Sequence, residues 1–475
     1  MKDNAIDTIY AVATPPGRSA VAVIRISGQN ASKAPGLFSV TCPPAGQFNV
    51  TRLMRAEKIL DQVILLFMRG PYSSTGEDVC EIHCHGSRAV IDAIMEQLER
   101  ASGFRLASPG EFTKRGFLNG KMDLSGVEGL ADLIDAQTPA QLHQAWAQID
   151  GALRTPVMAW RAELVKIAAQ LEALIDFSDE ELPALIEQNL RNGTTALITA
   201  LAENLADGGA GELVRDGVVV ALVGPANAGK STVFNGLAGR AAAIVSDEAG
   251  TTRDIVQIEL DLCGVPTTIL DTAGIRKTSG AIEREGINRS VIAATNADLV
   301  LVIVDGSDKY WRDAREKIDQ AIDCEISHSP TNGKIVSDKV INKRPRLYVL
   351  NKADRGIACL NYSSNSNDTH YTQDMLVISA KKSNDINALR KVLAKRLVPL
   401  NHAEGSVIIT RQRHRQSMEE AHDALRRALT YDFQRAPELA AEDFRLAACA
   451  LGRITGEIDV EELLGSIFSA FCIGK

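Results

Sequence analysis

One short run in the middle of the chain, Val218–Val223, is apolar at every position. Apolar runs without alternation are typical of a central strand in a parallel sheet that is covered on both faces. Three more short strand-like runs follow at Thr267–Leu270, Leu347–Leu350 and Leu376–Ile378. Apolar residues with the spacing of a helix follow directly after the first strand. We therefore expect a parallel α/β domain over residues 216–399.

The first 120 residues show instead the two-residue period of half-buried strands. Strands are expected at Thr8–Val12, Ala20–Ile26, Val63–Phe67 and Val79–His85, and a helix with Val90, Ile91, Ile94 and Leu98 on one face follows. In the strand Val79–His85, alternation sends Glu81, His83 and His85 to one face and Cys80, Ile82 and Cys84 to the other. Residues 1–120 are predicted to form a compact α+β domain.

A helical period dominates the two segments that flank the α/β region. The apolar positions are Val127, Leu130, Ala131, Ile134, Leu142, Trp146, Ile149, Leu164, Ile167, Ala168, Leu171 and Leu174 before it, and Met418, Ala421, Leu425, Leu429, Phe444, Leu446, Leu451, Leu463, Leu464, Ile467 and Phe468 after it. We interpret residues 121–215 and 400–475 as two parts of one all-helical domain into which residues 216–399 are inserted. The polar stretches 324–346 and 355–374 are predicted to be surface insertions.

Composition narrows the class of protein without identifying it. The chain has 475 residues, a net charge of −8 and 45% hydrophobic residues, as expected for a multidomain soluble protein. Because the net charge is negative, any contact with nucleic acid must come from a local basic patch or depend on a partner. Eight scattered cysteines suit a reducing compartment. The start of the chain lacks a signal-peptide core and no apolar run approaches the roughly 20 residues of a membrane span, so we expect a cytoplasmic protein without a membrane anchor.

The residues that follow Val223 carry the first chemistry. Gly224, Gly229, Lys230 and Ser231 have the spacing of a phosphate-binding loop, in which backbone N–H groups surround phosphate oxygens. The lysine then reaches the outer phosphates and the serine hydroxyl binds Mg²⁺. A glycine-rich turn with a solvated lysine is the alternative, and it requires strand, glycines, Lys-Ser and helix to coincide by chance.

Four later stretches lie where a GTPase needs them. Asp271 and Gly274 follow one strand, and Ala249–Asp254 supplies a threonine, Thr252, for Mg²⁺. The segment Asn351–Asp354 follows another strand, and its terminal carboxylate can accept hydrogen bonds from N1 and the 2-amino group of guanine. Adenine offers no such pair of donors. Ser379–Lys381 completes the base pocket, so the five motifs together predict guanine-nucleotide binding.

Two departures from the small-GTPase pattern concern hydrolysis. The position that usually holds a water-orienting glutamine is Ile275, which has no hydrogen-bonding group. Asn227 lies inside the phosphate loop, where its side-chain oxygen could bind a monovalent cation in place of an arginine finger. This predicts a potassium-stimulated GTPase. The alternative is that Asn227 is only a loop residue that tolerates an unusual backbone angle.

The N-terminal domain also contains an arginine, Arg25, within the apolar strand Val21–Ile26. A charge there needs a carboxylate partner or an anionic ligand, unless the side chain extends to solvent at the strand end. A metal site formed by the Cys and His residues of 80–85 is disfavoured, because alternation separates the thiols from the imidazoles.

These motifs occur in a characteristic order along nearly the whole chain. Thr14–Arg18, Arg25–Gly28, Gly76–Glu81, His85–Gly86, Ser108–Thr113 and Phe117–Lys121 precede the inserted GTPase, and the chain ends in Phe471–Lys475. This order resembles the MnmE (TrmE) family of bacterial tRNA-modifying GTPases. The resemblance implies a homodimer that works with MnmG, an FAD protein, in a heterotetramer to add an aminomethyl or carboxymethylaminomethyl group at C5 of the wobble uridine of tRNA. The one-carbon unit comes from a tetrahydrofolate, such as the 5-formyl or methylene derivative.

The resemblance assigns roles to individual residues. Folate contacts are expected at Arg25, Glu81, Lys121 and Lys475, and catalytic roles at Glu283, which orients water, Arg276 and Cys472. Mg²⁺ is expected at Ser231 and Thr252, and K⁺ at Asn227, Ser246, Glu248 and Thr251. The remaining contacts to GTP are expected from Ala228, Gly229, Lys230, Thr232, Asp247, Ala249, Gly250, Asp271, Thr272, Ala273, Gly274, Asn351, Lys352, Ala353, Asp354, Ser379, Ala380 and Lys381.

Two other functions share some of these features. A ribosome-assembly GTPase would have the same phosphate-loop asparagine, but no Gly-x-x-Gly RNA-binding module follows the GTPase here. A regulatory switch without folate would leave Arg25, Glu81 and Lys121 as unrelated charges.

Overall fold

The structure is a computed structural model that describes residues 7–176, 184–206, 209–239, 256–271, 297–328, 345–357, 371–372, 375–397, 408–458, 467–468, 471 and 474. It separates into two compact units. Unit 1 comprises Met1–Ile134, Trp146–Thr194 and Asp423–Lys475, and unit 2 comprises Asp135–Ala145 and Thr195–His422. The division into domains at residues 120, 215 and 399 stays a prediction.

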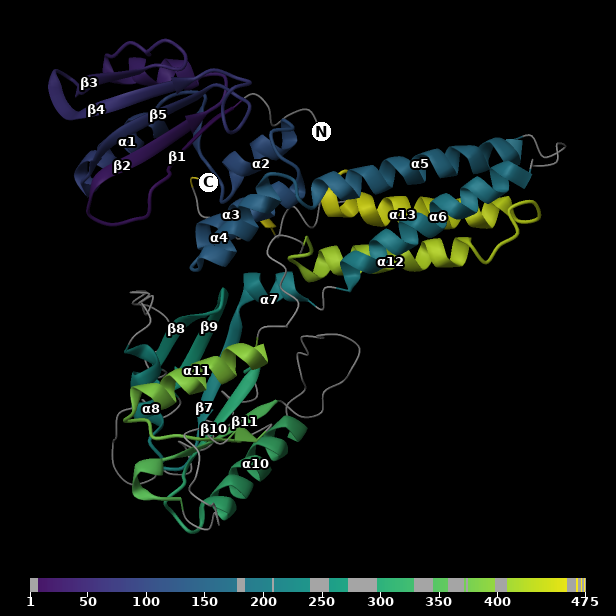
Figure 1. The fold of residues 1–475 in the computed structure, drawn as a ribbon. Helices are drawn as coiled ribbons and strands as arrows, with labels where there is room; N and C mark the ends of the chain where they lie inside the picture. Colours follow the sequence, from purple (N-terminus) through teal and green to yellow (C-terminus); the bar gives the residue numbers. More distant parts are fainter. Residues whose placement is uncertain are drawn as a thin grey trace. The chain divides into compact units, whose positions relative to one another are not determined.

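Unit 1 contains a six-stranded sheet with the order β3-β4-β5-β2-β1-β6. Its strands are Thr8–Val12 (β1), Ser19–Ser27 (β2), Phe48–Arg55 (β3), Lys58–Met68 (β4), Val79–Gly86 (β5) and Phe104–Leu106 (β6). The short helical segments Ala31–Phe38 (η1) and Arg88–Glu99 (α1) accompany the sheet (Figure 1). All four predicted strands are present. β3 and β6 were not predicted.

The two faces of this sheet differ in character. One face packs with α1 and η1 into a core that includes Ile24, Ile82 and Phe38, all fully buried. The predicted alternation in β5 is confirmed, because Cys80, Ile82 and Cys84 belong to that core. We call the other face, which carries Glu81, His83 and His85 on β5, the open face.

The rest of unit 1 is helical. Its helices are Glu111–Leu118 (α2), Leu124–Asp135 (α3), Arg154–Asp176 (α5) and Pro437–Thr455 (α13), and Pro139–Ile149 (α4), Ala184–Leu205 (α6) and Gln412–Ala428 (α12) continue from one unit into the other. Arg191 on α6 donates to the carbonyls of Leu429 and Tyr431, at 3.1 and 3.0 Å. The segments that precede and follow the second sheet in the sequence therefore pack against each other within unit 1.

Four of the apolar positions that indicated helices are exposed. Ile134 is 43%, Leu142 41%, Trp146 49% and Leu446 41% accessible to solvent. The helices α3, α4 and α13 form where the period predicts them, but these side chains do not belong to a core. Among the described residues, none of the helices is both long enough and apolar enough to cross a membrane.

Unit 2 contains a seven-stranded sheet with the order β12-β13-β11-β10-β7-β9-β8. Its elements are Ala210–Asp216 (α7), Val218–Val223 (β7), Lys230–Ala238 (α8), Val256–Leu262 (β8), Val265–Asp271 (β9), Leu299–Asp305 (β10), Trp311–His328 (α10), Arg346–Asn351 (β11), Ala353–Arg355 (η2), Tyr371–Thr372 (β12), Met375–Val377 (β13) and Ser383–Leu397 (α11). The five central strands are parallel, and β8 and β12 pair antiparallel at the two edges.

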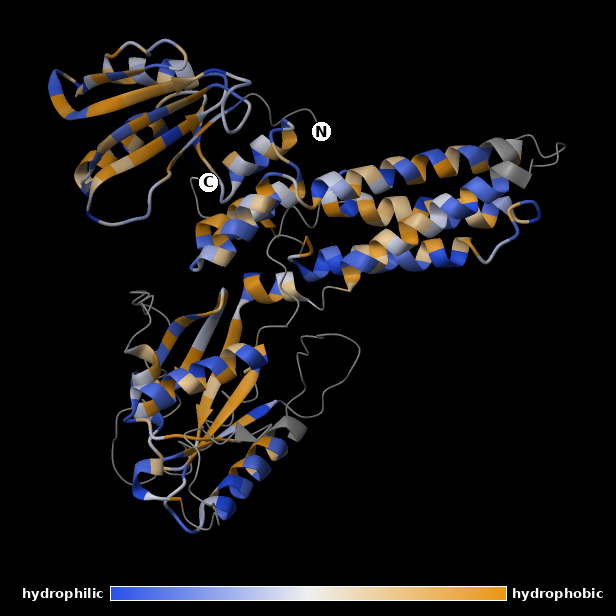
Figure 2. Ribbon diagram, viewed as in Figure 1, coloured by the Kyte–Doolittle hydropathy of each residue, from blue (hydrophilic) through white to orange (hydrophobic). Residues whose placement is uncertain are grey.

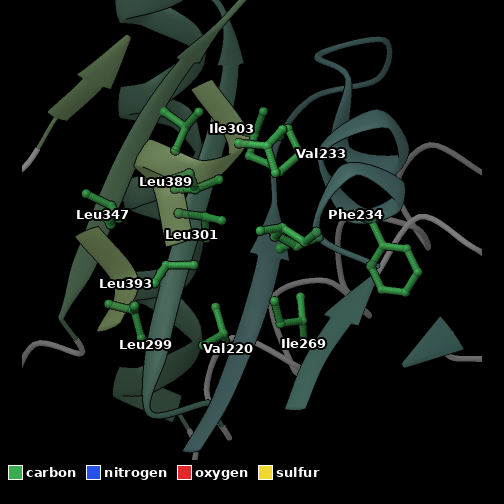
Figure 3. Packing of buried hydrophobic residues seen from close by; sticks show 14 of the residues in the cluster. Val220, Val233, Phe234, Ile269, Leu299, Leu301, Ile303, Leu347, Leu389 and Leu393 are labelled. Carbon is green, nitrogen blue, oxygen red and sulfur yellow. The ribbon is translucent and has the colours of Figure 1, made fainter. Parts of the chain in front are cut away.

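The central strands of this sheet are buried on both faces, as their uniform apolar sequence predicts. Val220, Leu301 and Leu347 face α8 and α11 and pack with Val233, Leu389 and Leu393 (Figure 3). Ala221, Val300 and Val302 belong to a second cluster with Trp311 and Ile322 of α10. Figure 2 accordingly shows these strands mostly orange along their length. The parallel arrangement places the carboxyl ends of β7, β9 and β11 at one edge.

Candidate functional site

The loop between β7 and α8 has the backbone geometry that its glycines predict. Gly229 has φ +94°, a conformation that side chains with a Cβ rarely adopt, and a Cβ at Gly224 would overlap the carbonyl of Ile303. Asn227 also lies in the left-handed region, with φ 64°. Asparagine is one of the residues that tolerate this region. The unusual angle that the loop-residue alternative predicts is thus present.

Lys230 folds back over this loop. Its ammonium group donates to the carbonyls of Gly224 at 2.7 Å and Pro225 at 2.9 Å. Burial lowers the pKa of Lys230, and the nearby carboxylate of Asp271 acts in the opposite direction. The loop carbonyls hold the cation at the position where phosphate oxygens are expected.

Ser231 and Asp271 come together from different elements. The Ser231 hydroxyl donates to the Asp271 carboxylate at 3.3 Å, and Asp271 is 3% exposed at the end of β9. A hydroxyl and a carboxylate are oxygen ligands of the kind that Mg²⁺ takes in nucleotide sites. Ser231 belongs to the predicted magnesium site, and Asp271 lies beside it.

The base-recognition motif after β11 is organised by Asn351. Its amide donates to the carbonyl of Ala228 and accepts from the backbone N–H of Ala380, both at 2.9 Å. Asn351 therefore joins the phosphate loop to the segment Ser379–Lys381. A pocket with a cavity volume of about 60 Å³ lies here, lined by Gly229, Thr232, Asn351, Lys352, Asp354, Arg355, Ser379, Ala380 and Lys381.

Asp354 lies on the wall of this pocket. Its carboxylate accepts from the Ser379 hydroxyl at 2.8 Å and lies 3.5 Å from the Lys381 ammonium. The Ser379 hydrogen bond, more than Lys381, holds the pKa of Asp354 below its usual value despite some desolvation. Lys352 is bound to Asp305 at 2.6 Å. The pocket thus presents an ionised carboxylate that can accept two N–H groups from a base.

The open face of unit 1 gives Arg25 a carboxylate partner, one of the outcomes that the sequence left open. Arg25 lies opposite Glu81 in the β2–β5 register, and its Nε donates to Glu81 at 2.8 Å. The second Glu81 oxygen lies 3.1 Å from His83 Nε2. The guanidinium also lies 5.9 Å from the ring centroid of Phe112 on α2. Burial alone would raise the pKa of Glu81, but Arg25 and then His83 bring it below its usual value.

The other predicted folate contacts lie near different parts of unit 1. Lys121 is exposed, and its ammonium donates to the carbonyl of Pro71 at 2.8 Å. Gly474, in the tail, lies so close to β1 that a Cβ there would come within 2.9 Å of the Cα of Ala13. Ala11, two residues earlier, pairs with Arg25. Gly474 therefore lies beside the end of β1, close to the residue that pairs with Arg25.

Several predicted site residues lie outside the described residues. They are Ser246, Asp247, Glu248, Ala249, Gly250, Thr251, Thr252, Thr272, Ala273, Gly274, Ile275, Arg276, Glu283, Cys472 and Lys475. Within the described parts of the chain, no group of three or more His, Cys, Asp or Glu residues is placed to hold a metal ion.

Sequence analysis missed a buried ionic network beside the open face. Arg115 on α2 is 7% exposed and binds Asp7 at 2.9 Å, Glu77 at 3.1 Å and Glu111 at 3.0 Å. These ion pairs join α2 to the residue before β1 and to the loop before β5. The Glu111–Arg115 spacing on one helix was the available signal.

Comparison with known proteins comes from two family models and from full-length relatives. Residues 8–121 match the model described as the GTP-binding protein TrmE N-terminus, and residues 124–472 match that of the MnmE helical domain. A protein of Parvibaculum lavamentivorans named tRNA modification GTPase MnmE is 44% identical over 99% of this chain and 100% of its own length. The protein of the same name from Rhodospirillum rubrum is 41% identical over 99% of this chain and 100% of its own length.

Proposed function

We propose, from the premise that this chain belongs to the MnmE family of tRNA modification GTPases, that it couples GTP hydrolysis to modification of the wobble uridine in tRNA. As a member of that family it is a GTP-hydrolysing, tRNA-modifying enzyme. The modification is an aminomethyl or carboxymethylaminomethyl group at C5, made with the FAD protein MnmG. Because tRNA is a cytoplasmic substrate, we expect the protein to act in the cytoplasm.

The observation that carries the nucleotide assignment is the set of contacts around Asn351. One side chain holds both the phosphate loop, through Ala228, and the base pocket, through Ala380. GTP would then place its phosphates at Lys230 and its base at Asp354. Mg²⁺, held by Ser231 and Thr252 with Asp271 nearby, would neutralise charge on the β- and γ-phosphates. Binding of ATP at the strength of GTP would contradict this assignment.

Hydrolysis requires a group to replace the glutamine that Ile275 lacks. In this proposal Asn227, Ser246, Glu248 and Thr251 would hold K⁺ when two GTPase domains face each other, and Glu283 would orient the attacking water. The left-handed backbone of Asn227 is what the loop-residue alternative predicts, so the potassium dependence of turnover decides between the two roles.

The residues of the open face fit an anionic folate. Arg25 uses only its Nε on Glu81, so within the described chain its two terminal nitrogens have no hydrogen-bond partner. The glutamate part of a folate carries the carboxylates that such a guanidinium binds. Lys121, Lys475 and Cys472 complete the proposed site, and the approach of Gly474 to β1 supports a role for the tail there.

The open face also suits the proposed homodimer. Phe48 is 70%, Val50 55% and Ile64 41% exposed, and Val50 lies opposite Ile64 in the β3–β4 register. Exposed apolar side chains gathered on one sheet face are typical of an interface. A dimer through unit 1 would keep two GTPase domains at high effective concentration, and MnmG would join it in a heterotetramer.

Turnover in potassium and in sodium chloride tests the GTPase part of the proposal. Potassium should accelerate GTP hydrolysis and sodium should not, and Glu283→Ala should remove most of the acceleration while GTP affinity stays unchanged. Equal turnover in the two salts would contradict the potassium site.

Titration calorimetry with 5-formyltetrahydrofolate tests the folate part. Arg25→Ala should weaken binding about tenfold or more, because it removes a charge-assisted hydrogen bond, and GTP hydrolysis by the isolated GTPase part should be unaffected. Unchanged folate affinity in this variant would contradict the assignment.

A further inference from the structure

The helices on the two faces of the unit 2 sheet differ in charge. The helices α8 and α11 share one core cluster with the sheet, and α10 belongs to the cluster on the other face. The charged residues of α8 and α11 are mostly basic: Lys230, Arg390, Lys391, Lys395 and Arg396, against Asp385. Over residues 311–324 the charged residues of α10 are more often acidic: Asp313, Glu316, Asp319 and Asp323, against Arg312, Arg315 and Lys317. The α11 side of the sheet is therefore basic in a chain whose net charge is −8.

The contacts of this layer leave its positive charge in place. Asp385 already accepts from the backbone N–H of Ser379 at 2.7 Å. Arg390 donates to the carbonyl of Leu237 at 2.5 Å. Carbonyls are neutral acceptors, so this contact holds the guanidinium without cancelling its charge.

The neighbouring edge strand directs its acidic side chains away from this layer. Ile258, Leu260 and Leu262 of β8 pack with the core cluster that contains α8 and α11. Successive side chains of a strand point to opposite faces of the sheet, so Glu259 and Asp261 lie on the other face. Acids of β8 therefore do not neutralise the basic layer.

Two lysines form the exposed part of this basic layer. Lys391 and Lys395 are one helical turn apart on α11, on the side opposite the buried Leu389 and Leu393. Both lysines are exposed, and neither forms an ion pair with another residue that the structure describes. Like charges at this spacing destabilise a helix. The pair therefore does not serve the stability of α11.

We propose that the exposed face of α11, with Lys391 and Lys395, binds the phosphate backbone of the tRNA substrate. This inference rests on the proposed function and names the surface of the GTPase part that would contact the tRNA. A chain with a net charge of −8 repels a polyanion as a whole, so contact requires a local basic surface of this kind. Lysine is a flexible point charge, which suits phosphate contacts that position a nucleic acid without reading its bases.

A double substitution in the full chain tests the surface. Binding of an unmodified tRNA transcript is measured by filter binding in about 50 to 200 mM potassium chloride. Lys391→Gln together with Lys395→Gln should weaken binding about tenfold at the lowest salt concentration. The slope of log affinity against log salt concentration should become shallower by about two, because each lost phosphate contact removes about one unit.

A matched control removes the same charge from the other side of the sheet. Lys309 and Lys317 are exposed, the first just before α10 and the second on it. Lys309→Gln together with Lys317→Gln should leave the tRNA affinity within about twofold of wild type and the salt slope unchanged. An equal loss in the two double variants would show that only the net charge matters, and it would overturn the assignment to α11.

The remaining outcomes separate this inference from the proposed function. Wild type and the α11 variant should hydrolyse GTP equally, which verifies that the variant is folded. Equal tRNA affinity and salt slope in these two proteins, or no binding of the transcript by wild type, would overturn the α11 surface alone. Binding to phosphatidylglycerol vesicles that depends on the two lysines, without binding to tRNA, would assign the surface to a lipid and overturn the inference. Failure of the proposed function would appear instead as absence of uridine modification by wild type with MnmG.

Discussion

The nucleotide site of unit 2 differs from the open face of unit 1 and its neighbouring Arg115 network in how the charged side chains are held. At the nucleotide site Lys230 is held by backbone carbonyls five and six residues earlier in its own loop. In unit 1, Arg25 is held by a carboxylate 56 residues away, and Arg115 by one that is 108 residues away. The first arrangement is local in sequence, whereas the second exists only once the sheet and α2 have assembled.

This difference has consequences for both function and stability. A carbonyl that holds an ammonium group is a neutral acceptor, which a phosphate can replace with a stronger, charge-assisted bond. The carboxylates around Arg115 already neutralise its charge in a largely buried setting. Removal of one charged partner therefore leaves a buried charge without an opposite charge beside it. Substitutions at the nucleotide site should therefore alter ligand binding, and those in the Arg115 network should alter folding.

The largest expected effect is a change of base specificity through Asp354. Asp354→Asn replaces an acceptor of two N–H groups by an amide that donates to the 2-oxygen of xanthine. GTP affinity should fall at least about a hundredfold, and xanthosine triphosphate should bind better than GTP. Competition against a fluorescent GTP analogue measures both affinities. An unaltered unfolding temperature in this variant would support the separation of binding from folding, and retained preference for GTP would refute the base assignment.

The next largest effect concerns the buried network. Arg115→Met keeps the length of the side chain but leaves Asp7, Glu77 and Glu111 with fewer partners, and it should destabilise unit 1 by about 3–5 kcal/mol. Urea unfolding, followed by a probe in unit 1, measures this change, and GTP affinity should be unaffected.

Arg445→Met is the matched control for Arg115→Met. Arg445 forms an ion pair with Glu442 on the surface of α13, where the two side chains are 62% and 53% exposed. Arg445→Met should leave the unfolding free energy nearly unchanged, because water screens an exposed ion pair. Similar losses in the two variants would show that burial does not determine the strength of these pairs.

The same contrast explains what the sequence could predict. β7, the phosphate loop and Asn351–Asp354 are encoded by contiguous residues, and the structure has them within one residue of the predicted bounds. For Arg25 the sequence left three outcomes open: a carboxylate partner, an anionic ligand, or a side chain that extends to solvent. The pairing with Glu81 depends on β5 lying next to β2, which is a property of the sheet order.

The missed elements have a related cause. β3 has exposed apolar residues, with Phe48 70% and Val50 55% accessible, so it lacks the polar alternation of an ordinary edge strand. Arg115 was missed because two of its three carboxylate partners, Asp7 and Glu77, come from distant segments. A pattern-based reading cannot recognise a buried arginine whose partners are brought together by the tertiary fold.

A pH-dependent prediction follows from Glu111. Burial would raise the pKa of this carboxyl, but Arg105, the Ser108 N–H and Arg115 together lower it to about 2. A depressed pKa stabilises the folded state above the unfolded value of about 4.3, and this contribution is lost as pH falls toward about 2. Glu111→Gln should thus cost about 2 kcal/mol at pH 6, and its difference from wild type should shrink below about pH 4. Urea unfolding of both proteins across that range measures the difference, and a constant gap would contradict the ionic origin.

The smallest expected effect returns to the nucleotide site and compares its ion pair with those of unit 1. Lys381 lies 3.5 Å from Asp354 and is 69% exposed, so Lys381→Ala should change the unfolding free energy of unit 2 by less than about 0.5 kcal/mol. The lysine nevertheless lines the base pocket, and its aliphatic stem covers apolar surface there. GTP affinity should fall by about threefold to tenfold, again without a change in stability. Thermal unfolding without nucleotide and calorimetry with GTP separate the two quantities. A loss of stability as large as that in Arg115→Met would mean that ion pairs at the nucleotide site also hold the fold, and the distinction between the two regions would then fail.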